Sequence, residues 1–384
     1  MKRIDKIITA LAASFCGIAV LSFGVGYATW TYSTSADPAT VNIDGQVGTW
    51  TLVFPKQGDG GFVDSGGEHV DGTYENGSSS DRGDNNGSLY EIDNSENAST
   101  LILPTQLVNG EDSSQIDSIT RVSIYDESED PYKALTNASS ITEIDIPKQY
   151  EAIDWASFCY MENLTTIKFY GDDSTTASSL VISGCAFFGD KNLSYVELPS
   201  SLSFIGYDAF YCEASDTVPL TIVYDGTIKQ WMTKVNKQTD WCYKRNITGE
   251  CSDASIYYDS SSYNASSRYY PETVTYYDSA TTVEDSTFDT DTALISVTFG
   301  SSSSLTSIGQ SAFYNCIRLS SVGSLPTSLT SIGDSAFAIT EDASTTALSV
   351  KYAGNKRAWS RVTKGTGWDS NRTGSSALTV SYNA

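Results

Sequence analysis

Large apolar residues recur along this chain at a spacing in the twenties. A six-residue pattern, Ile-Gly-x-x-Ala-Phe, begins at Ile205, Ile308 and Ile332, and looser copies begin at Ile153 and Ile182. The phenylalanines that end neighbouring copies lie 29, 23 and 24 residues apart. A period of this length with fixed apolar positions is typical of a solenoid, in which each coil covers the apolar face of its neighbour. A solenoid presents a long ordered surface, so the pattern indicates binding rather than catalysis.

Each coil is predicted to contain one strand, because its residues follow the pattern apolar-x-x-apolar-x-apolar. Pro147, Pro199 and Pro326 each end one of these strands, since proline cannot donate a hydrogen bond to a continuing ladder. The Ile-Gly-x-x-Ala-Phe segment should then cross the back of the coil, where glycine permits the bend and phenylalanine packs between coils. The predicted strands are 119–124, 141–146, 164–169, 193–198, 294–299 and 319–325.

The two stacks of coils end in the same way. Residues 220–231 match residues 348–359, and Thr227 and Asn355 are suited to cap the N-terminus of a short helix. A strand then follows at 254–258 or 377–382. We predict that this strand–helix–strand segment is a cap over the open edge of the solenoid. The Tyr- and Ser-rich stretch between the two stacks is predicted to be a spacer, with room for an edge strand through Val274, Tyr276 and Tyr277.

The N-terminal part of the chain is predicted to contain three different segments. Lys2, Arg3 and Lys6 precede a long apolar run, which is typical of an export signal, although the run could also stay as a membrane span. An alternation of apolar and small polar residues follows, and then a stretch rich in Gly, Asp, Asn and Ser that reads as a linker or long loop. The predicted domains are a signal peptide or anchor (1–28), a β-rich segment (29–56), an acidic linker (57–100), a first capped module (101–258), a spacer (259–282) and a second capped module (283–384).

The net charge of the chain limits which classes of partner it can bind. The 384 residues include 47 Asp and Glu against 23 Lys and Arg, a net charge of −24. This balance argues against nucleic acid, whose phosphates need cationic partners, and against a polybasic contact with a membrane. Only the apolar N-terminal segment, if uncleaved, would contact a membrane. We therefore expect an exported chain, at the cell surface or outside the cell.

The repeat resembles the BspA-type leucine-rich repeat of bacterial surface proteins. Residues 193–210 and 319–337 carry the pattern L-x-x-V-x-(I/L)-P-x-S-L-x-x-I-G-x-x-A-F best, and the likeness extends over roughly residues 115–384. It implies a leucine-rich-repeat horseshoe on a cell surface. Together with the caps and the N-terminal alternation described above, the predicted fold is a β-dominated leucine-rich-repeat solenoid of two capped modules, with short helices in the caps and a β-rich N-terminal segment. The resemblance also implies adhesion to a protein partner, on a host or neighbouring cell. Asp154 and Ser183 replace the glycine in two copies, and the unit at 283–299 is degraded, which leaves the curvature open.

No catalytic site is predicted, and the resemblance supplies no catalytic motif. His69 is the chain's one histidine and lies in the predicted linker, so histidine-assisted nucleophilic catalysis would need it to dock beside a nucleophile. Carboxylates are numerous, but nothing in the sequence places two of them across a cleft. We predict no enzyme activity, no cofactor and no metal site. Calcium bound by the acidic linker is the alternative, although the spacing fits no EF-hand loop.

Two small motifs have a functional and a plainer interpretation. Arg82-Gly83-Asp84 is an integrin-type tripeptide, but such residues meet by chance in a Gly- and Asp-rich stretch. Cys242 and Cys251 are both absent from the matching second cap, as expected if they form a disulfide. Two independent thiols are the alternative.

The main site prediction is the concave side of the first module, where alternate strand residues face outward. Tyrosines beside mixed charges there favour a protein interface. The second module offers mostly Ser and Thr at these positions. Self-association through residues 29–56, as a structural component of the envelope or matrix, and glycan binding are the alternative functions. The predicted partner-binding residues are Arg121, Ser123, Tyr125, Glu143, Asp145, Thr166, Lys168, Tyr195 and Glu197.

Overall fold

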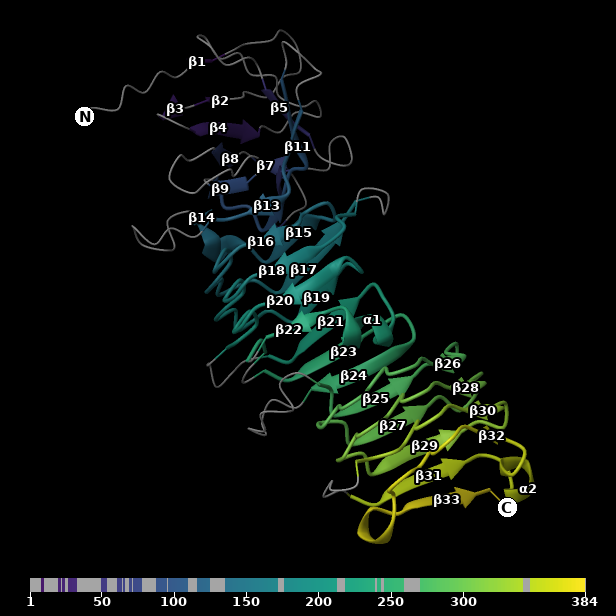
Figure 1. Cartoon of the computed structure of the whole chain (residues 1–384). Helices are drawn as coiled ribbons and strands as arrows, with labels where there is room; N and C mark the ends of the chain where they lie inside the picture. The colour runs from purple at the N-terminus through teal and green to yellow at the C-terminus, as the bar shows by residue number, and fades with distance from the viewer. Residues whose placement is uncertain are drawn as a thin grey trace. The chain divides into compact units, whose positions relative to one another are not determined.

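The computed structural model divides into two compact units, Met1–Val218 and Pro219–Ala384 (Figure 1). Among the described residues, no helix combines the length and the apolar character that crossing a membrane requires. From residue 116 on, the described residues are 116–124, 135–171, 176–212, 218–238, 240–242, 245–258, 270–340 and 346–383. Before it they are 8–9, 20–21, 23–24, 27–32, 50–53, 61–63, 65, 69–70, 72–77, 88–94 and 96–109.

Short, mostly antiparallel strand pairs make up the start of the first unit. β4 (Tyr27–Tyr32) pairs with β8 (Gly72–Gly77), which pairs with β9 (Ser88–Asp93). β5 (Trp50–Val53) pairs with β11 (Gln106–Asn109). The remaining strands here are β1 (Ile8–Thr9), β2 (Val20–Leu21), β3 (Phe23–Gly24), β6 (Gly61–Val63), β7 (His69–Val70), β12 (Ile116–Ser118) and β14 (Leu135–Thr136). Apart from β1 to β4, the predicted signal segment lies outside the described residues.

The prediction of a linker or long loop over residues 57–100 is wrong where strands β6 to β9 lie, and its last residue begins a further strand. The end of this polar stretch is held by a buried asparagine. The Asn94 side chain accepts a hydrogen bond from the Ala98 N–H (2.7 Å) and donates to the Ala98 carbonyl oxygen (3.0 Å) and to Ser140 Oγ (2.8 Å). Backbone groups that water would otherwise satisfy are therefore paired inside the protein, which composition alone does not reveal.

Each later coil of the first unit gives one strand to each of two parallel sheets (Figure 1). The first sheet holds β10 (Thr100–Ile102), β15 (Glu143–Pro147), β17 (Thr166–Tyr170) and β19 (Tyr195–Leu198). The second holds β9 with β13 (Arg121–Val122), β16 (Ala152–Ile153), β18 (Leu180–Ile182) and β20 (Leu202–Ile205). Strands β15, β17 and β19 begin two residues later than predicted, because the apolar residue that opens each pattern closes a turn first. Ile141, for example, donates its N–H to the Ala138 carbonyl oxygen of the 3-10 helix η1 (Ala138–Ser140).

Phenylalanines stack along the core of both units, which confirms the predicted solenoid packing. In the first unit the ring centres of Phe158 and Phe187 lie 5.8 Å apart, and those of Phe187 and Phe210 lie 5.3 Å apart. In the second unit the Phe288–Phe313 and Phe313–Phe337 centres lie 5.3 Å and 5.1 Å apart. Each ring fills the space between coils that no single coil could bury alone. The degraded repeat at 283–299 therefore still contributes its phenylalanine, Phe288.

The repeat glycine has a different reason from the one predicted. Gly309 does not adopt a left-handed conformation, but a Cβ atom there would lie 2.5 Å from the backbone nitrogen of Asp285 in the preceding coil. Gly206 is confined in the same way, 2.3 Å from the nitrogen of Gly184. The bend comes two residues later, at left-handed non-glycine residues such as Ser311 (φ 51°). Close approach of neighbouring coils, rather than a bend, thus excludes a side chain at these glycines.

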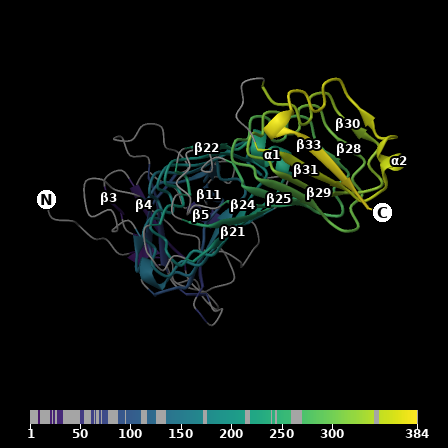
Figure 2. The same ribbon diagram turned by 90° about the horizontal axis from the view of Figure 1, so that it is seen from below.

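The second unit has the same two-sheet coil, and Figure 2 shows β28 and β30 across the coil from β29 and β31. Its short helices are α1 (Ile228–Thr233), α2 (Lys356–Trp359) and the 3-10 helix η3 (Gly374–Ser376). One sheet holds β21 (Leu220–Tyr224), β23 (Ile247–Glu250), β24 (Ala254–Tyr258), β25 (Thr273–Tyr276), β27 (Ser296–Phe299), β29 (Ser321–Leu325), β31 (Leu348–Tyr352) and β33 (Leu378–Tyr382). The other strands of this unit are β22 (Asn236–Lys237), β26 (Thr282–Val283), β28 (Ser307–Ile308), β30 (Ser331–Ile332) and β32 (Thr363–Lys364).

The first cap does not end the sheet. β24 pairs antiparallel with β23 on one side and antiparallel with β25 on the other. β25 also pairs parallel with β27, so the predicted edge strand at 274–277 is an interior strand instead. Two reversals of direction restore the original polarity, which lets the parallel coils resume after the first cap. In the second cap the predicted strand, helix and returning strand are present as β31, α2 and β33, and β33 is the last strand of the sheet.

Candidate binding surface

Six of the predicted binding residues lie on one face of the first unit. In register, Glu143 faces Thr166 and Thr166 faces Tyr195, while Asp145 faces Lys168. The residues that alternate with them, Ile144, Ile167 and Val196, are fully buried, so the six point to the opposite side of the sheet. We call this surface the sheet face. It consists of Glu143, Asp145, Thr166, Lys168, Tyr195 and Glu197.

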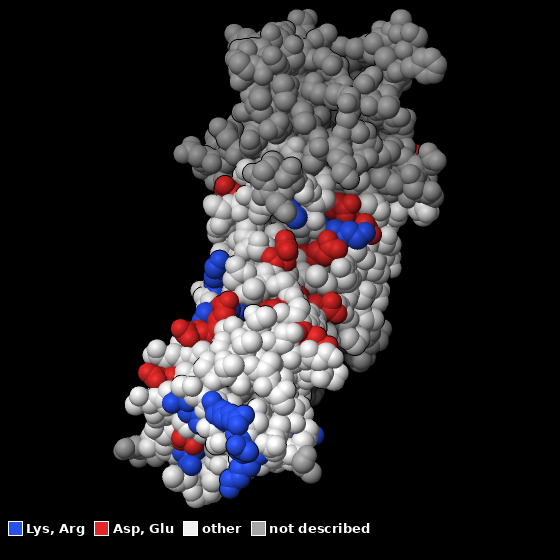
Figure 3. All heavy atoms as spheres, turned by 90° about the vertical axis from the view of Figure 1, so that its right-hand side faces the viewer, with Lys and Arg blue, Asp and Glu red and all other residues white. Residues whose placement is uncertain are grey.

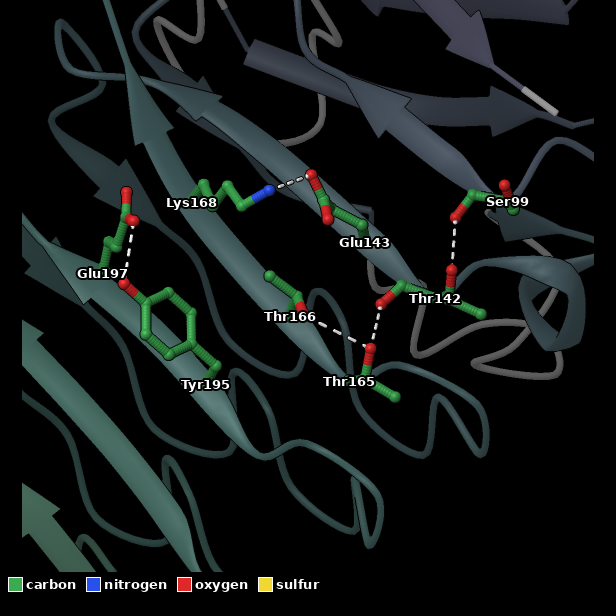
Figure 4. A network of polar contacts seen from close by, with 8 residues as sticks. All are labelled: Ser99, Thr142, Glu143, Thr165, Thr166, Lys168, Tyr195 and Glu197. Carbon is green, nitrogen blue, oxygen red and sulfur yellow. Dashed lines mark hydrogen bonds and ion pairs between the residues drawn. The ribbon is translucent and has the colours of Figure 1, made fainter. Parts of the chain in front are cut away.

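Side chains of the sheet face are held by one another (Figure 4). Lys168 Nζ lies 2.6 Å from Glu143 Oε1, with side-chain exposures of 41% and 28%. The hydrogen bond that Lys168 donates to Glu143 raises the pKa of Lys168, so the ammonium stays charged. On β19 the Tyr195 hydroxyl donates to Glu197 Oε1 at 2.9 Å. Three charged groups and a tyrosine are therefore fixed in position before any partner arrives.

A ladder of hydroxyl groups runs along one end of these strands. Thr142 Oγ1 donates to the Ser99 carbonyl oxygen (3.2 Å), and Thr165 Oγ1 donates to the Thr142 carbonyl oxygen (2.9 Å). Ser194 Oγ continues to the Thr165 carbonyl oxygen at 3.3 Å. These bonds join each coil to the one before it. They fix the register that brings the sheet face together.

Asp145 makes the charge of the sheet face sensitive to pH. Burial, and next the charge of Glu143, raise the pKa of this half-buried carboxyl from 3.8 to about 6. The ammonium of Lys168 opposes the shift but does not cancel it. The face therefore carries one cation among three carboxylic acids, one of which takes up a proton in mildly acidic solution.

Two of the predicted residues lie elsewhere, and a third cannot be placed. Arg121 belongs to β13 of the other sheet, where its Nη2 donates to Asp154 Oδ1 at 2.9 Å. Ser123 is the first residue after the end of β13. The positions next to Glu143 and Asp145 are filled instead by Thr100 and Ile102 of β10. The apolar spacing of residues 119–124 imitates the first-sheet strand but forms a second-sheet strand. Tyr125 lies outside the described residues.

An exposed aromatic group in the first unit escaped the sequence analysis. Trp155 and Tyr207, two coils apart, lean over Gly184 with ring centres 5.1 Å apart and exposures of 37% and 45%. A Cβ atom on Gly184 would lie 2.7 Å from the Trp155 ring, so only glycine leaves room for this contact. Tyr160, five residues after Trp155 and 50% exposed, packs its ring against Phe188, four residues after Gly184. The available signal was two aromatics flanking a glycine at one repeat position in three successive coils.

The remaining predicted sites add no chemistry to the described surface. Cys242 and Cys251 are both buried thiols, and the structure has no bond between them. Burial raises the pKa of the Cys251 thiol to about 12. Arg82, Gly83 and Asp84 lie outside the described residues, as do most of the linker carboxylates considered for calcium. Within the part of the chain that is described, no three His, Cys, Asp or Glu side chains are grouped to hold a metal ion.

The second unit offers smaller polar side chains at the equivalent strand positions. Thr275 and Thr298 share a hydrogen bond of 2.8 Å between their hydroxyls, and Ser296 and Ser321 are neighbours in register. None of these side chains has a tyrosine ring or a charge to offer a partner. These four positions therefore offer a partner less than the sheet face does, and on the same side of this sheet the exposed Tyr257 of β24 and Lys351 of β31 are the larger side chains.

Comparison with known proteins identifies the repeat. Residues 173–224 and 262–355 match the BspA type leucine rich repeat region, in six copies. Similar solved structures include the pneumococcal vaccine antigen PcpA, with 15% identity over 85% of this chain and 88% of that chain and a TM-score of 0.29. A leucine rich cell surface protein from Faecalibacterium prausnitzii A2-165 shows 16% identity over 76% and 96%, with a TM-score of 0.26. A leucine-rich repeat protein from Bacteroides ovatus ATCC 8483 shows 19% identity over 82% and 70%, with a TM-score of 0.29. No curated protein sequence matches the chain.

Proposed function

We propose, from the BspA-type leucine-rich repeats on which this chain is built, that it is an exported cell-surface protein that binds a protein partner. Repeats of this family occur in surface proteins, and the N-terminal apolar run following Lys2, Arg3 and Lys6 supports export. Binding through an extended surface suits a solenoid, whose coils leave side chains in fixed rows. The role is adhesion or recognition, without catalysis.

The observation that carries this proposal is the fixed arrangement of the sheet face. Lys168 is held by Glu143 at 2.6 Å, and Tyr195 is held by Glu197 at 2.9 Å. Side chains that are already ordered lose less conformational entropy when a partner binds, so more of the contact energy appears as affinity. Tyrosine beside charges of both signs is a composition that protein interfaces favour. A protein with a complementary charge pattern fits this face best.

The exposed aromatic group is too small to be the whole interface. Trp155, Tyr160 and Tyr207 are between one third and one half exposed, so together they offer about 300 Å² of ring surface. A stable protein interface buries about 800 Å² on each partner. These rings can add local affinity, since Trp and Tyr dominate many interfaces, but the sheet face must supply the larger contact.

The test is adhesion of the full chain to cultured cells. Wild-type protein is immobilised and compared with a Lys168→Glu/Tyr195→Ala variant, and with a Thr298→Ala/Ser321→Ala variant as a matched change in the second unit. We expect the first variant to lose adhesion at least about tenfold, because one charge is reversed and one ring removed. The second-unit variant should adhere normally. Unchanged adhesion of the first variant would reject the sheet face.

Two further comparisons complete the experiment. Brief proteolysis of the cells beforehand should lower adhesion to the level of the Lys168→Glu/Tyr195→Ala variant, because the partner of the sheet face is a protein. Adhesion that proteolysis leaves unchanged would reject a protein partner in favour of a glycan. Trp155→Ala/Tyr207→Ala, with Tyr257→Ala as the control at an exposed tyrosine of the second unit, measures the contribution of the aromatic group. Urea unfolding of every variant separates a lost contact from a lost fold.

A further inference from the structure

The C-terminal segment of the chain has a positive net charge, opposite in sign to that of the whole protein. Residues 346–384 contain six Lys and Arg but one acidic residue, Asp369, although the whole chain has a net charge of −24. Figure 3 shows Lys and Arg side chains gathered over the C-terminal end of the second unit. A local excess of this kind stands out in an acidic protein, because cations scattered for solubility would lie among carboxylates.

Two of these six cations are explained by the fold. Lys364 Nζ donates to the carbonyl oxygens of Trp359 (3.0 Å) and Val362 (2.8 Å) and lies 4.4 Å from the centre of the Trp359 ring. Arg372 is buried and donates to the carbonyl oxygens of Phe337 (2.7 Å) and Cys316 (3.2 Å). Both side chains are therefore held inside the fold by hydrogen bonds to backbone oxygens.

The other four cations, Lys351, Lys356, Arg357 and Arg361, are exposed. Three of them lie on or directly after α2, within six residues of one another, and Lys351 lies on the preceding strand β31. None of the four caps the N-terminus of the helix, where the Asn355 side chain accepts a hydrogen bond from the Ala358 N–H at 2.9 Å. We call these four residues the basic cap surface.

The first cap shows that the fold does not require this charge. Residues 219–258 form the same strand, capped helix and returning strand, yet they balance five Lys and Arg with four Asp and Glu. Three aligned positions account for part of the difference. Val223 corresponds to Lys351, Ile228 to Lys356, and Asp225 to Ala353, and each replacement makes the second cap more positive. An excess that the same fold omits elsewhere in the chain points to a ligand.

We propose that the basic cap surface binds an anionic polysaccharide at the cell surface. The guanidinium groups of Arg357 and Arg361 suit paired hydrogen bonds to carboxylate, sulfate or phosphate groups, and the two lysines add charge without fixing geometry. The inference uses the cell-surface location of the proposed function, but not the sheet face. An anionic polysaccharide is a thin chain with anionic groups at regular intervals, so a few of these groups can contact the small basic cap surface.

Charge also separates this ligand from a second copy of the protein. Two copies, each with a net charge of −24, repel one another at long range, and four exposed cations would have to overcome that repulsion. A polysaccharide does not bring a second folded body of like charge. Because the basic cap surface is exposed to water, its attraction is screened over about 8 Å at physiological salt, so the binding should weaken steeply as salt rises.

The experiment uses the full chain with dextran sulfate and polygalacturonate as anionic probes and neutral dextran as the control polymer. Affinity is measured at low and high salt for wild type, for Arg357→Glu/Arg361→Glu, and for Lys229→Glu/Lys234→Glu at the aligned positions of the first cap. We expect wild type to bind an anionic polymer but not dextran. The second-cap variant should lose at least about tenfold in affinity, and the first-cap variant should bind like wild type.

Three outcomes would overturn the proposal. Equal binding by the second-cap variant would remove the basic cap surface as the site, and equal losses in both variants would show a general charge effect. Concentration-dependent self-association, measured by light scattering and lost in the second-cap variant, would assign the surface to a second copy instead if no polymer binds. Preference for sulfate or carboxylate identifies the anionic group. Normal cell adhesion by the second-cap variant would keep this result separate from the sheet face.

Discussion

The ammonium group of Lys237 lies 4.8 Å from the centre of the Trp231 ring and donates a hydrogen bond to the Trp231 carbonyl oxygen at 2.9 Å. A second bond reaches the Val235 carbonyl oxygen at 3.0 Å. The lysine therefore donates to carbonyl oxygens at and just after the end of α1, where no further helical turn supplies N–H donors. Lys364 and Trp359 repeat this arrangement after α2. The pair is a device for ending the cap helix inside the core.

Burial of Lys237 should make stability depend on pH. Burial lowers its pKa from 10.5 to about 7, so above pH 7 the unfolded chain binds more protons at this site than the folded chain. The free energy of unfolding that neutral Lys237 contributes is fully present above its unfolded pKa of 10.5 and is lost as the pH falls through about 7. Between about pH 7 and about pH 8.5 the wild type should gain roughly 1–2 kcal/mol relative to Lys237→Met.

Urea unfolding of both proteins at the two pH values measures this difference directly. Other ionisable groups are common to both proteins and cancel in the comparison. Parallel pH profiles for the two proteins would contradict a depressed pKa at Lys237. Lys364→Met is a useful partner variant, because that lysine is only half-buried, and its pKa is lowered without a large shift.

The phenylalanine stack should hold the first unit together. Phe187 is 1% exposed and stacks on both Phe158 and Phe210. Phe187→Ala should lower the free energy of unfolding by about 3–5 kcal/mol, since it removes a buried ring and leaves a cavity between coils. Phe188→Ala, at the partly exposed neighbouring ring, should cost about 1 kcal/mol. Similar losses in the two variants, measured by urea unfolding, would show that the stack has no special weight.

Substitutions at Gly309 and Ser311, two positions of the same Ile-Gly-x-x-Ala-Phe segment, should change the free energy of unfolding in different ways. Gly309→Ala places a methyl group 2.5 Å from the Asp285 nitrogen, so we expect a loss of about 3 kcal/mol in the free energy of unfolding. Ser311→Gly relieves a left-handed backbone at φ 51°, which should leave stability unchanged or raise it by up to about 1 kcal/mol. Thermal and urea unfolding provide the comparison. Tolerance of Gly309→Ala would contradict the close approach of coils.

Asp145 should destabilise the protein as the pH rises. Its folded pKa of about 6 is above the value of 3.8 expected for an unfolded chain, so its contribution is present below the unfolded pKa and is lost as the pH rises through about 6. Asp145→Asn should therefore be near neutral at about pH 4 and more stable than wild type at about pH 7. The gain should be under about 1 kcal/mol, because the group is partly exposed. A variant that is less stable than wild type at neutral pH would reverse the sign and contradict the prediction.

The coil, the phenylalanine stack and the elements of the second cap could be predicted from the sequence, because each follows from local periodicity. Apolar spacing places Ile144, Ile167 and Val196 in the core, and their neighbours on the sheet face follow by alternation. The same reasoning misplaced Arg121, because its short strand has the same apolar spacing as a first-sheet strand. Which sheet a strand joins depends on its position in the coil, and no pattern of six residues contains that information.

The features that sequence reasoning missed depend on contacts between coils. The strands within residues 57–100 are closed by Asn94, whose partners lie up to 46 residues away. The interior position of β25 depends on β24 pairing on both of its edges. Trp155 and Tyr207 meet because Gly184 in the intervening coil has no side chain. In each case the deciding partner is far along the chain, so composition and spacing cannot reveal it.

The antiparallel strand β24, lying between two strands that run alike, bears on how such a chain can grow. A gene segment that encodes coils followed by this reversing strand could be copied in tandem, and every new block would begin in the direction of the last. Length could then change by whole blocks during evolution.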